Sequence, residues 1–183
     1  MEIDFEKGTI IDNFLTLKEY DEIYRTICNS QFPFGFSDKV INYNPTEDNE
    51  QIARTTSGTN YEYYFANMVY KRDMPNSPHA PLLMNIFIPK LIELGVFTSL
   101  MRIKVNLYPY IGEVKEHGMH TDQDFFVKGA VFCINTCDGY TKYNDTKFDS
   151  VKNRMIFFDS GKMHTGTTAS NTKARININF NFL

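Results

Sequence analysis

Two of the four histidines in the 183-residue chain lie beside two aspartates in the segment EHGMHTDQDF, residues 116–125. Residues two apart in an extended segment point to the same side, so the side chains of His120 and Asp122 can meet at one point. His117 and Asp124 need not join them, and Asp124 is expected to be a solvated loop residue or to orient a ligand. The His-x-Asp pair therefore supplies two ligands of a candidate metal site.

The third ligand must come from one of the two remaining histidines. His79 lies in a proline-rich loop and is expected at the surface, whereas His164 follows the apolar run RMIFFD, which could return it across a sheet to His120. Two imidazoles and one carboxylate leave three positions of an octahedron open, which suits non-haem Fe(II) that binds a cosubstrate and dioxygen together. His117 is an alternative ligand, but it lacks a carboxylate two residues later, which favours an indirect or exposed role.

Arg175 stands at the start of an alternating segment, RININFNF. A guanidinium on the inward side of a barrel is costly without an acidic partner, and a bidentate ligand anion would supply the matching geometry. A structural ion pair with a buried carboxylate such as Asp159 is the other interpretation. The alternation places Arg175, Asn177, Asn179 and Asn181 on one face and Ile176, Ile178, Phe180 and Phe182 on the other.

The order His120-x-Asp122, then His164, then Arg175 resembles the Fe(II)/2-oxoglutarate-dependent oxygenase superfamily, more narrowly its small prolyl-4-hydroxylase-like branch. The match covers about residues 100–182, and the lead-in IIDNFLTLKEYDEI is similar to the first helix of many such enzymes. The chain also resembles small stand-alone oxygenases of marine tailed phages. The resemblance implies a double-stranded β-helix, or jelly roll.

The same resemblance implies Fe(II) held by His120, Asp122 and His164, with 2-oxoglutarate as cosubstrate, dioxygen as oxidant and ascorbate as a candidate reductant. Arg175 would pair with the far carboxylate of 2-oxoglutarate. The implied reaction hydroxylates an aliphatic C–H bond, with release of succinate and CO2. The substrate is a small molecule, a peptide or a protein, with a prolyl side chain favoured by the resemblance.

Tyr108, in the motif NLYP, resembles the tyrosine that often hydrogen-bonds the cosubstrate in this branch, and Asn177 would assist from the same face as the arginine. Tyr110 or Asn106 are alternatives for the tyrosine's role. Ordinary aromatic packing is the other interpretation of Tyr108, because the chain has 11 tyrosines.

Two other function classes stay open. A cupin-type metal enzyme would use the same triad without 2-oxoglutarate, so Arg175 would not be needed. A non-catalytic jelly roll would bind a ligand or peptide in a polar cavity, and its binding would survive loss of both His120 and His164.

Composition limits the partners. With 183 residues, the chain is expected to form one domain, 1–183, in which residues 1–99 support a core of residues 100–183. A formal net charge of −3 without a block of Lys or Arg makes nucleic acid an unlikely main partner.

No apolar run reaches membrane-spanning length and the N-terminus lacks a secretory pattern. The protein is therefore expected in the cytoplasm, which would be that of the host cell if the source is viral. The three cysteines, Cys28, Cys133 and Cys137, are expected to be buried free thiols, and the oligomeric state is left open.

The supporting elements divide into two helices and a series of strands, so the predicted class is α+β, mainly β, with the N-terminal helices packed on one sheet. Residues 10–30 predict an entry strand and a helix with a Thr16/Glu19 capping box and a Leu15/Tyr20 staple. Residues 31–80, which include FPFGF, NYNPTEDNEQ and YEYYF, predict short strands between long loops, and residues 80–94 a second helix kinked near Pro89. From residue 100 on, MRIKVNLY, AVFCIN, RMIFFD and ARININFNF predict antiparallel strands. The predicted buried helix positions are Leu17, Tyr20, Ile23, Tyr24 and Ile27, then Leu82, Leu83, Ile86, Phe87, Leu91 and Ile92.

Overall fold

The computed structural model describes residues 2–38 and 63–183, mainly as antiparallel strands in two sheets. The large sheet has eight strands, in the order β1-β9-β6-β11-β5-β3-β2 with β4 paired to β3, and the small sheet has the order β10-β7-β8. The large-sheet strands are β1 (Thr9–Ile11), β2 (Gly35–Ser37), β3 (Tyr64–Lys71), β4 (Met74–Pro75), β5 (Leu100–Pro109), β6 (Lys128–Cys133), β9 (Arg154–Asp159) and β11 (Ala174–Phe182). The small-sheet strands are β7 (Tyr140–Tyr143), β8 (Thr146–Asp149) and β10 (His164–Gly166).

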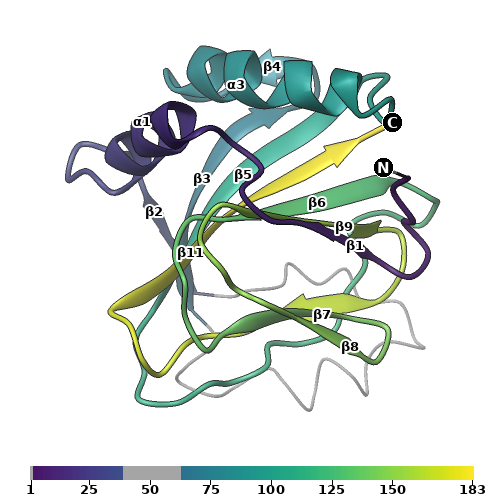
Figure 1. The fold of residues 1–183 in the computed structure, drawn as a ribbon. Helices are drawn as coiled ribbons and strands as arrows, with labels where there is room; N and C mark the ends of the chain where they lie inside the picture. The colour runs from purple at the N-terminus through teal and green to yellow at the C-terminus, as the bar shows by residue number, and fades with distance from the viewer. Residues whose placement is uncertain (1, 39–62) are drawn as a thin grey trace.

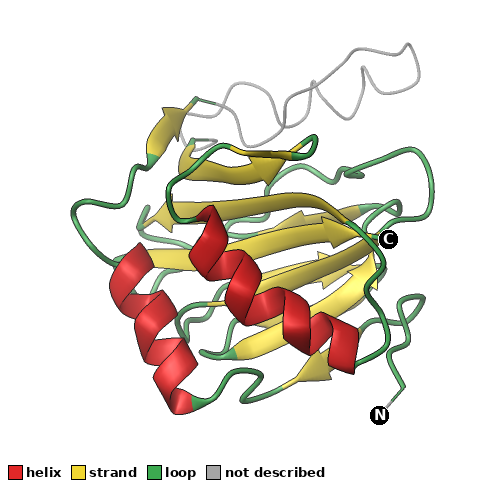
Figure 2. Cartoon of the chain, turned by 90° about the horizontal axis from the view of Figure 1, so that it is seen from above, coloured by secondary structure: helices red, strands yellow, loops and turns green. Residues whose placement is uncertain are grey.

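The two helices of the described chain, α1 (Leu17–Ile27) and α3 (Ala80–Glu93), lie on one side of the large sheet, and the small sheet lies on the other (Figure 1). Seen from above, both helices cross the strands that they cover (Figure 2). The predicted class, a mainly β jelly roll with helices packed on one sheet, is confirmed. One face of the large sheet is thus left for the helices and the other for the site.

Helix α1 begins at the predicted capping box. The Thr16 N–H donates to Glu19 Oε2 at 2.8 Å, and the Glu19 N–H donates to Thr16 Oγ1 at 3.3 Å. The predicted buried face was too wide, because Leu17 is 79% and Tyr24 44% exposed. At about 100° per residue, both lie roughly 70–90° from the centre of the stripe that faces the core. That stripe is Tyr20, Ile23 and Ile27.

Helix α3 runs through Pro89 without interruption and ends in a Schellman motif. The Gly95 N–H donates to the Ile92 carbonyl at 2.8 Å and the Val96 N–H to the Leu91 carbonyl at 3.2 Å, with Gly95 at φ +70°. The prediction that Ile92 is buried is wrong, because this residue is 57% exposed. The residues of α3 that reach the sheet form one row along the helix, and Ile92 lies outside it. That row is Ala80, Leu83, Phe87 and Leu91.

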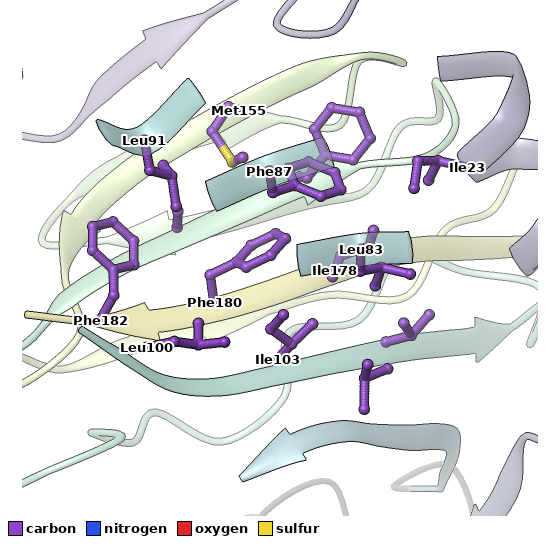
Figure 3. Close-up of a cluster of buried hydrophobic side chains, with 14 of the residues drawn as sticks. Ile23, Leu83, Phe87, Leu91, Leu100, Ile103, Met155, Ile178, Phe180 and Phe182 are labelled. Atoms are coloured by element: carbon purple, nitrogen blue, oxygen red, sulfur yellow. The ribbon is translucent and has the colours of Figure 1, made fainter. Parts of the chain in front are cut away.

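The core fills the space between the helices and the apolar face of the large sheet. In Figure 3, the side chains of Phe180 and Ile103 from the strands lie beside those of Phe87 and Leu83 from α3. The Phe87 ring centroid lies 4.7 Å from that of Phe180 and 5.0 Å from that of Phe132. The alternation of β5 and β11 therefore sends apolar residues to the helices and leaves polar ones facing the small sheet.

The small sheet comes from residues 140–149 and 164–166, which lie between the strands that the sequence predicts. Its strands have only three or four residues, too short for an alternating pattern to stand out among Gly, Asn and Asp. Tyr143 pairs with Thr146 across a tight turn, in which Asn144 takes φ +50°. This hairpin and β10 supply the wall opposite the polar face of the large sheet.

In the described ranges, no helix is long and apolar enough to cross a membrane. Cys133 and Cys137 are buried free thiols as predicted, but Cys28, at the C-terminal cap of α1, is exposed. Strands β2 and β4 confirm the short strands predicted between residues 31 and 80, whereas β3 is longer, with eight residues. The segment NYNPTEDNEQ and the first two residues of YEYYF lie outside the described residues.

Candidate metal centre and adjoining cavity

The structure brings His120, Asp122 and His164 to one point. The His120 N–H donates to the His164 carbonyl at 3.0 Å, and the His164 N–H returns a bond to the His120 carbonyl at 2.9 Å. The Asp122 N–H donates to the Ser160 carbonyl at 2.8 Å, which fixes the backbone after the first histidine. One potential ligand atom from each side chain lies within 4.8 Å of the other two.

Both imidazoles are oriented through their Nδ1 atoms. His164 Nδ1 lies 2.9 Å from the Lys162 carbonyl, and His120 Nδ1 lies 3.3 Å from the Gly118 carbonyl. A carbonyl only accepts, so each Nδ1 carries the proton and each Nε2 keeps its lone pair. Burial lowers the pKa of both histidines, that of His120 to about 4, so both rings are neutral at pH 7.

Asp122 is held as a carboxylate by two donors on the large sheet. Arg102 Nη2 lies 2.6 Å from its Oδ2, and Asn181 Nδ2 donates to the same oxygen at 2.9 Å. Burial alone would raise the pKa of Asp122, but the Arg102 guanidinium and the facing imidazoles outweigh it and leave this pKa well below its usual range. The Oδ1 atom lies 4.0 Å from His120 Nε2. Two neutral imidazoles and one ionised carboxylate fit the donor set of a 2-His-1-carboxylate iron site.

Arg175 is fully buried, at 0% exposure, on the polar face of β11. Its Nη2 donates to Thr141 Oγ1 at 2.9 Å and its Nη1 to the Thr167 carbonyl at 3.2 Å, while its Nε has no partner among the described residues. No described carboxylate lies within ion-pair distance of it. Asp159, the alternative partner, instead accepts from the Gly161 N–H at 2.9 Å. A buried guanidinium without an acid indicates that an anionic ligand completes the site.

Tyr108 lies directly opposite Arg175 in the pairing of β5 with β11 and is 7% exposed. Its ring stacks between Tyr64, at a centroid distance of 5.6 Å, and His117, at 5.0 Å. Burial raises the pKa of Tyr108 to about 12, so its hydroxyl stays protonated. His117 is only 4% exposed, so the exposed role considered for it is wrong. It is a stacking neighbour of Tyr108 and lies apart from the triad's shared point.

The two predicted asparagines face each other: Asn106 Nδ2 donates to Asn177 Oδ1 at 3.0 Å. Both line the same cavity as the triad, and Asn106 keeps an Oδ1 without a partner among the described residues. Tyr110 is 55% exposed and does not line this cavity, so Tyr108 and Asn106 are the better placed of the three candidates.

The two remaining candidate residues differ in exposure. Asp124 is exposed, as expected. His79 is half-buried beside the start of α3, where its ring stacks on Phe32 with centroids 5.0 Å apart. Neither lines the cavity.

A cavity of about 260 Å³ joins the triad to Arg175. Its floor is the polar face of β3, β5 and β11, and its other wall includes Thr141, Thr165 and Gly166 of the small sheet. Sequence reasoning missed Arg102 and Asn181 as partners of Asp122 and Thr141 as a partner of Arg175. The strand alternation was a usable signal for the first two, because it places them on the same faces as Tyr108 and Arg175.

No protein-family model and no curated protein matches the chain. Solved structures match it along nearly its whole length. A viral collagen prolyl hydroxylase from Paramecium bursaria Chlorella virus-1, in complex with 2-oxoglutarate, is 16% identical with a TM-score of 0.56, and 96% of each chain is covered. A prolyl hydroxylase from Trichoplax adhaerens, in complex with a peptide of hypoxia inducible factor, is 18% identical with a TM-score of 0.61 over 96% of this chain and 83% of that one. A 2OG-Fe(II) oxygenase family oxidoreductase from Burkholderia pseudomallei is 10% identical with a TM-score of 0.65, over 95% and 84%.

These similarities establish the fold over nearly the whole described chain. At such low identity the assignment of a chemistry depends on the side chains that line the cavity.

Proposed function

We propose that this chain, which has the fold of the Fe(II)/2-oxoglutarate oxygenases, is itself an enzyme of that kind that hydroxylates an aliphatic C–H bond and releases succinate and CO2. The observation that carries the proposal is the fully buried Arg175, without an acidic partner among the described residues, in one cavity with two imidazoles and a carboxylate that share a point. The names of the three solved structures, two prolyl hydroxylases and a 2OG-Fe(II) oxygenase, support it.

The triad would hold the metal. His120 and His164 offer neutral Nε2 atoms whose orientation is fixed before binding, and Asp122 offers Oδ1, because Arg102 and Asn181 already occupy Oδ2. Bound Fe(II) would supply the centre at which dioxygen and 2-oxoglutarate react. A site whose ligands are already ordered binds metal without a further cost in side-chain entropy.

Arg175 would grip the far carboxylate of 2-oxoglutarate. Its two bonds to neutral oxygens, Thr141 Oγ1 and the Thr167 carbonyl, orient the guanidinium without neutralising it. The protonated hydroxyl of Tyr108 can donate to the same acid, and Asn177 lies two residues along the same face. Bidentate pairing of guanidinium and carboxylate then supplies both affinity and selection for a diacid.

The proposed substrate carries an aliphatic C–H bond and is a small molecule or part of a peptide. The prolyl hydroxylases among the solved structures support a prolyl side chain as one such substrate. We also propose that residues 1–183 act as one oxygenase domain, in which the helices of the first half support the sheet that carries the site. A reducing cytoplasm suits the three free thiols and an iron that must stay ferrous.

The direct test is turnover. The protein is loaded anaerobically with Fe(II), mixed with 2-oxoglutarate, oxygen and ascorbate, and succinate is quantified. Even without a substrate, slow uncoupled formation of succinate is expected. His164→Ala should lower it about 100-fold or more, because loss of a ligand exceeds the 10–100-fold effect of losing an outer partner. His79→Ala, outside the cavity, is the matched control. Absence of 2-oxoglutarate binding and turnover in the metal-loaded wild-type protein would contradict the proposal.

A further inference from the structure

Three cationic side chains besides Arg175 line the cavity. Lys71 on β3 lies opposite Arg102 on β5, and Lys104 follows two residues later on the same face of β5. Arg175 lies opposite Tyr108, six residues further along β5 than Arg102, or about 20 Å at roughly 3.3 Å per residue. Lys104 Nζ lies over the Tyr64 ring, which stacks on Tyr108, so it reaches the middle of the cavity, whereas the backbones of Lys71 and Arg102 lie at the end far from Arg175.

The described lining of the cavity has more positive charge than the proposed metal and cosubstrate balance. This lining has four cationic side chains and one carboxylate, Asp122, which leaves three positive charges. A metal dication and a 2-oxoglutarate dianion cancel each other, so this excess would persist in the loaded site. Clustered like charges are unfavourable unless an anion or solvent screens them, so a further anion is favoured.

The cationic side chains retain donors for such an anion. Lys104 Nζ donates to Tyr64 OH at 2.6 Å, which leaves two of its three protons, and the Arg102 Nε has no partner among the described residues. Neither Lys71 nor Lys104 forms an ion pair with a described carboxylate. Between Arg102 and Tyr108 on β5, the 99%-buried side chain of Asn106 keeps on the cavity lining an Oδ1 that has no partner among the described residues. That oxygen suits a hydroxyl or amine on the same ligand.

We propose that Lys71 and Lys104, together with the remaining donors of Arg102, bind the anionic group of the primary substrate, a small molecule that carries a carboxylate or a phosphate. The assignment of this ligand as a substrate rests on the proposed function. The part of the substrate that enters the cavity must be small, because the volume of about 260 Å³ also has to hold 2-oxoglutarate. Lys71 and Lys104 are then specificity-determining residues, and they hold the C–H bond of the substrate near the triad.

The test is anion binding to the protein loaded with Mn(II) and 2-oxoglutarate. Sulfate, as a stand-in for a phosphate group, and acetate, for a carboxylate, are titrated separately by calorimetry. At least one should bind with 1:1 stoichiometry, and the stronger of the two identifies the anionic group. Lys71→Gln combined with Lys104→Gln should weaken that binding about tenfold, because charge-assisted contacts are lost. Lys71→Arg with Lys104→Arg should retain it. Lys18→Gln with Lys152→Gln changes the same charge at exposed positions and should have no effect.

Three outcomes would overturn the proposal: no anion binding, equal binding in the glutamine variant, or displacement of 2-oxoglutarate by the anion. Stimulation of succinate formation by an acidic peptide, but by no small carboxylate or phosphate ester, would overturn the small-molecule assignment. Failure of the proposed function has a different signature. In that case 2-oxoglutarate gives no binding heat, whereas lysine-dependent sulfate or acetate binding to the Mn(II) protein is retained.

Discussion

At the scale of single residues, the contact between Arg102 and Asp122 has a testable energetic consequence. The two side chains are 20% and 10% exposed and lie 2.6 Å apart, so loss of the guanidinium would leave a largely buried carboxylate with only Asn181 as a donor. Arg102→Gln is expected to lower the free energy of unfolding of the metal-free protein by about 2 kcal/mol.

Added Mn(II) should restore much of this loss, because a dication on Asp122 replaces the missing positive charge. Urea unfolding with and without Mn(II) measures both effects. Arg25→Gln, at an exposed position on α1, is the control. An equal loss with and without metal would show that Mn(II) does not compensate for the missing guanidinium at Asp122.

His117 makes stability depend on pH. Burial and the Arg175 charge lower its pKa to about 4, whereas the unfolded chain protonates this ring near 6.5. Between these values the unfolded state binds more protons, so the contribution to stability is complete above pH 6.5 and is lost as the pH falls towards 4. From pH 7 to 5, this residue should cost about 2 kcal/mol.

His117→Phe removes that titration and keeps a ring against Tyr108, and no described residue bonds to the Nε2 atom that it deletes. Urea unfolding of the metal-free variant and wild type at pH 7 and 5 should therefore differ in slope, with a flatter dependence in the variant. Equal loss of stability in both proteins would mean that His117 is protonated in the folded state at pH 5.

At the scale of elements, the small sheet must approach Arg175 closely, and Gly139 before β7 permits it. A Cβ at this position would lie 2.5 Å from the Thr168 carbonyl oxygen and 2.7 Å from Arg175 Cδ. Gly139→Ala should therefore displace the guanidinium, destabilise the fold by about 1–3 kcal/mol and weaken 2-oxoglutarate binding. Gly35→Ala is the control, because its nearest contact would be an ordinary 3.6 Å. Unchanged urea unfolding and calorimetric affinity would show that the small sheet moves without cost.

The longer elements could be predicted from sequence and the shorter ones could not. The capping box of α1 and the alternation of β11 are local signals, and both are present in the structure. Strands β7, β8 and β10 have no such signal, because three or four residues fit many conformations and their pairing with each other comes from the fold as a whole. Exposed Leu17 and Ile92 show a related limit: periodicity locates an apolar face, but tertiary contact decides how much of it is covered.

At the scale of the whole molecule, the order of the motifs along the sequence predicted that His120, Asp122 and His164 would share one site, and the strand topology explains why they do. His164 is 44 residues after His120, yet the β10 segment returns it as a direct bridge partner. The contact of Thr141 with Arg175 depends on how the two sheets face each other. A sequence pattern carries no signal for such contacts between elements.

The central claim is that one cavity holds a metal on the triad and an acid on Arg175. A crystal structure of the protein grown with Mn(II) and 2-oxoglutarate tests it most directly. We expect electron density for one metal bound by Nε2 of His120, Nε2 of His164 and a carboxylate oxygen of Asp122, with the far carboxylate of 2-oxoglutarate paired with the Arg175 guanidinium. A metal bound elsewhere, or a cavity in which Arg175 contacts no acid at saturating 2-oxoglutarate, would contradict the account.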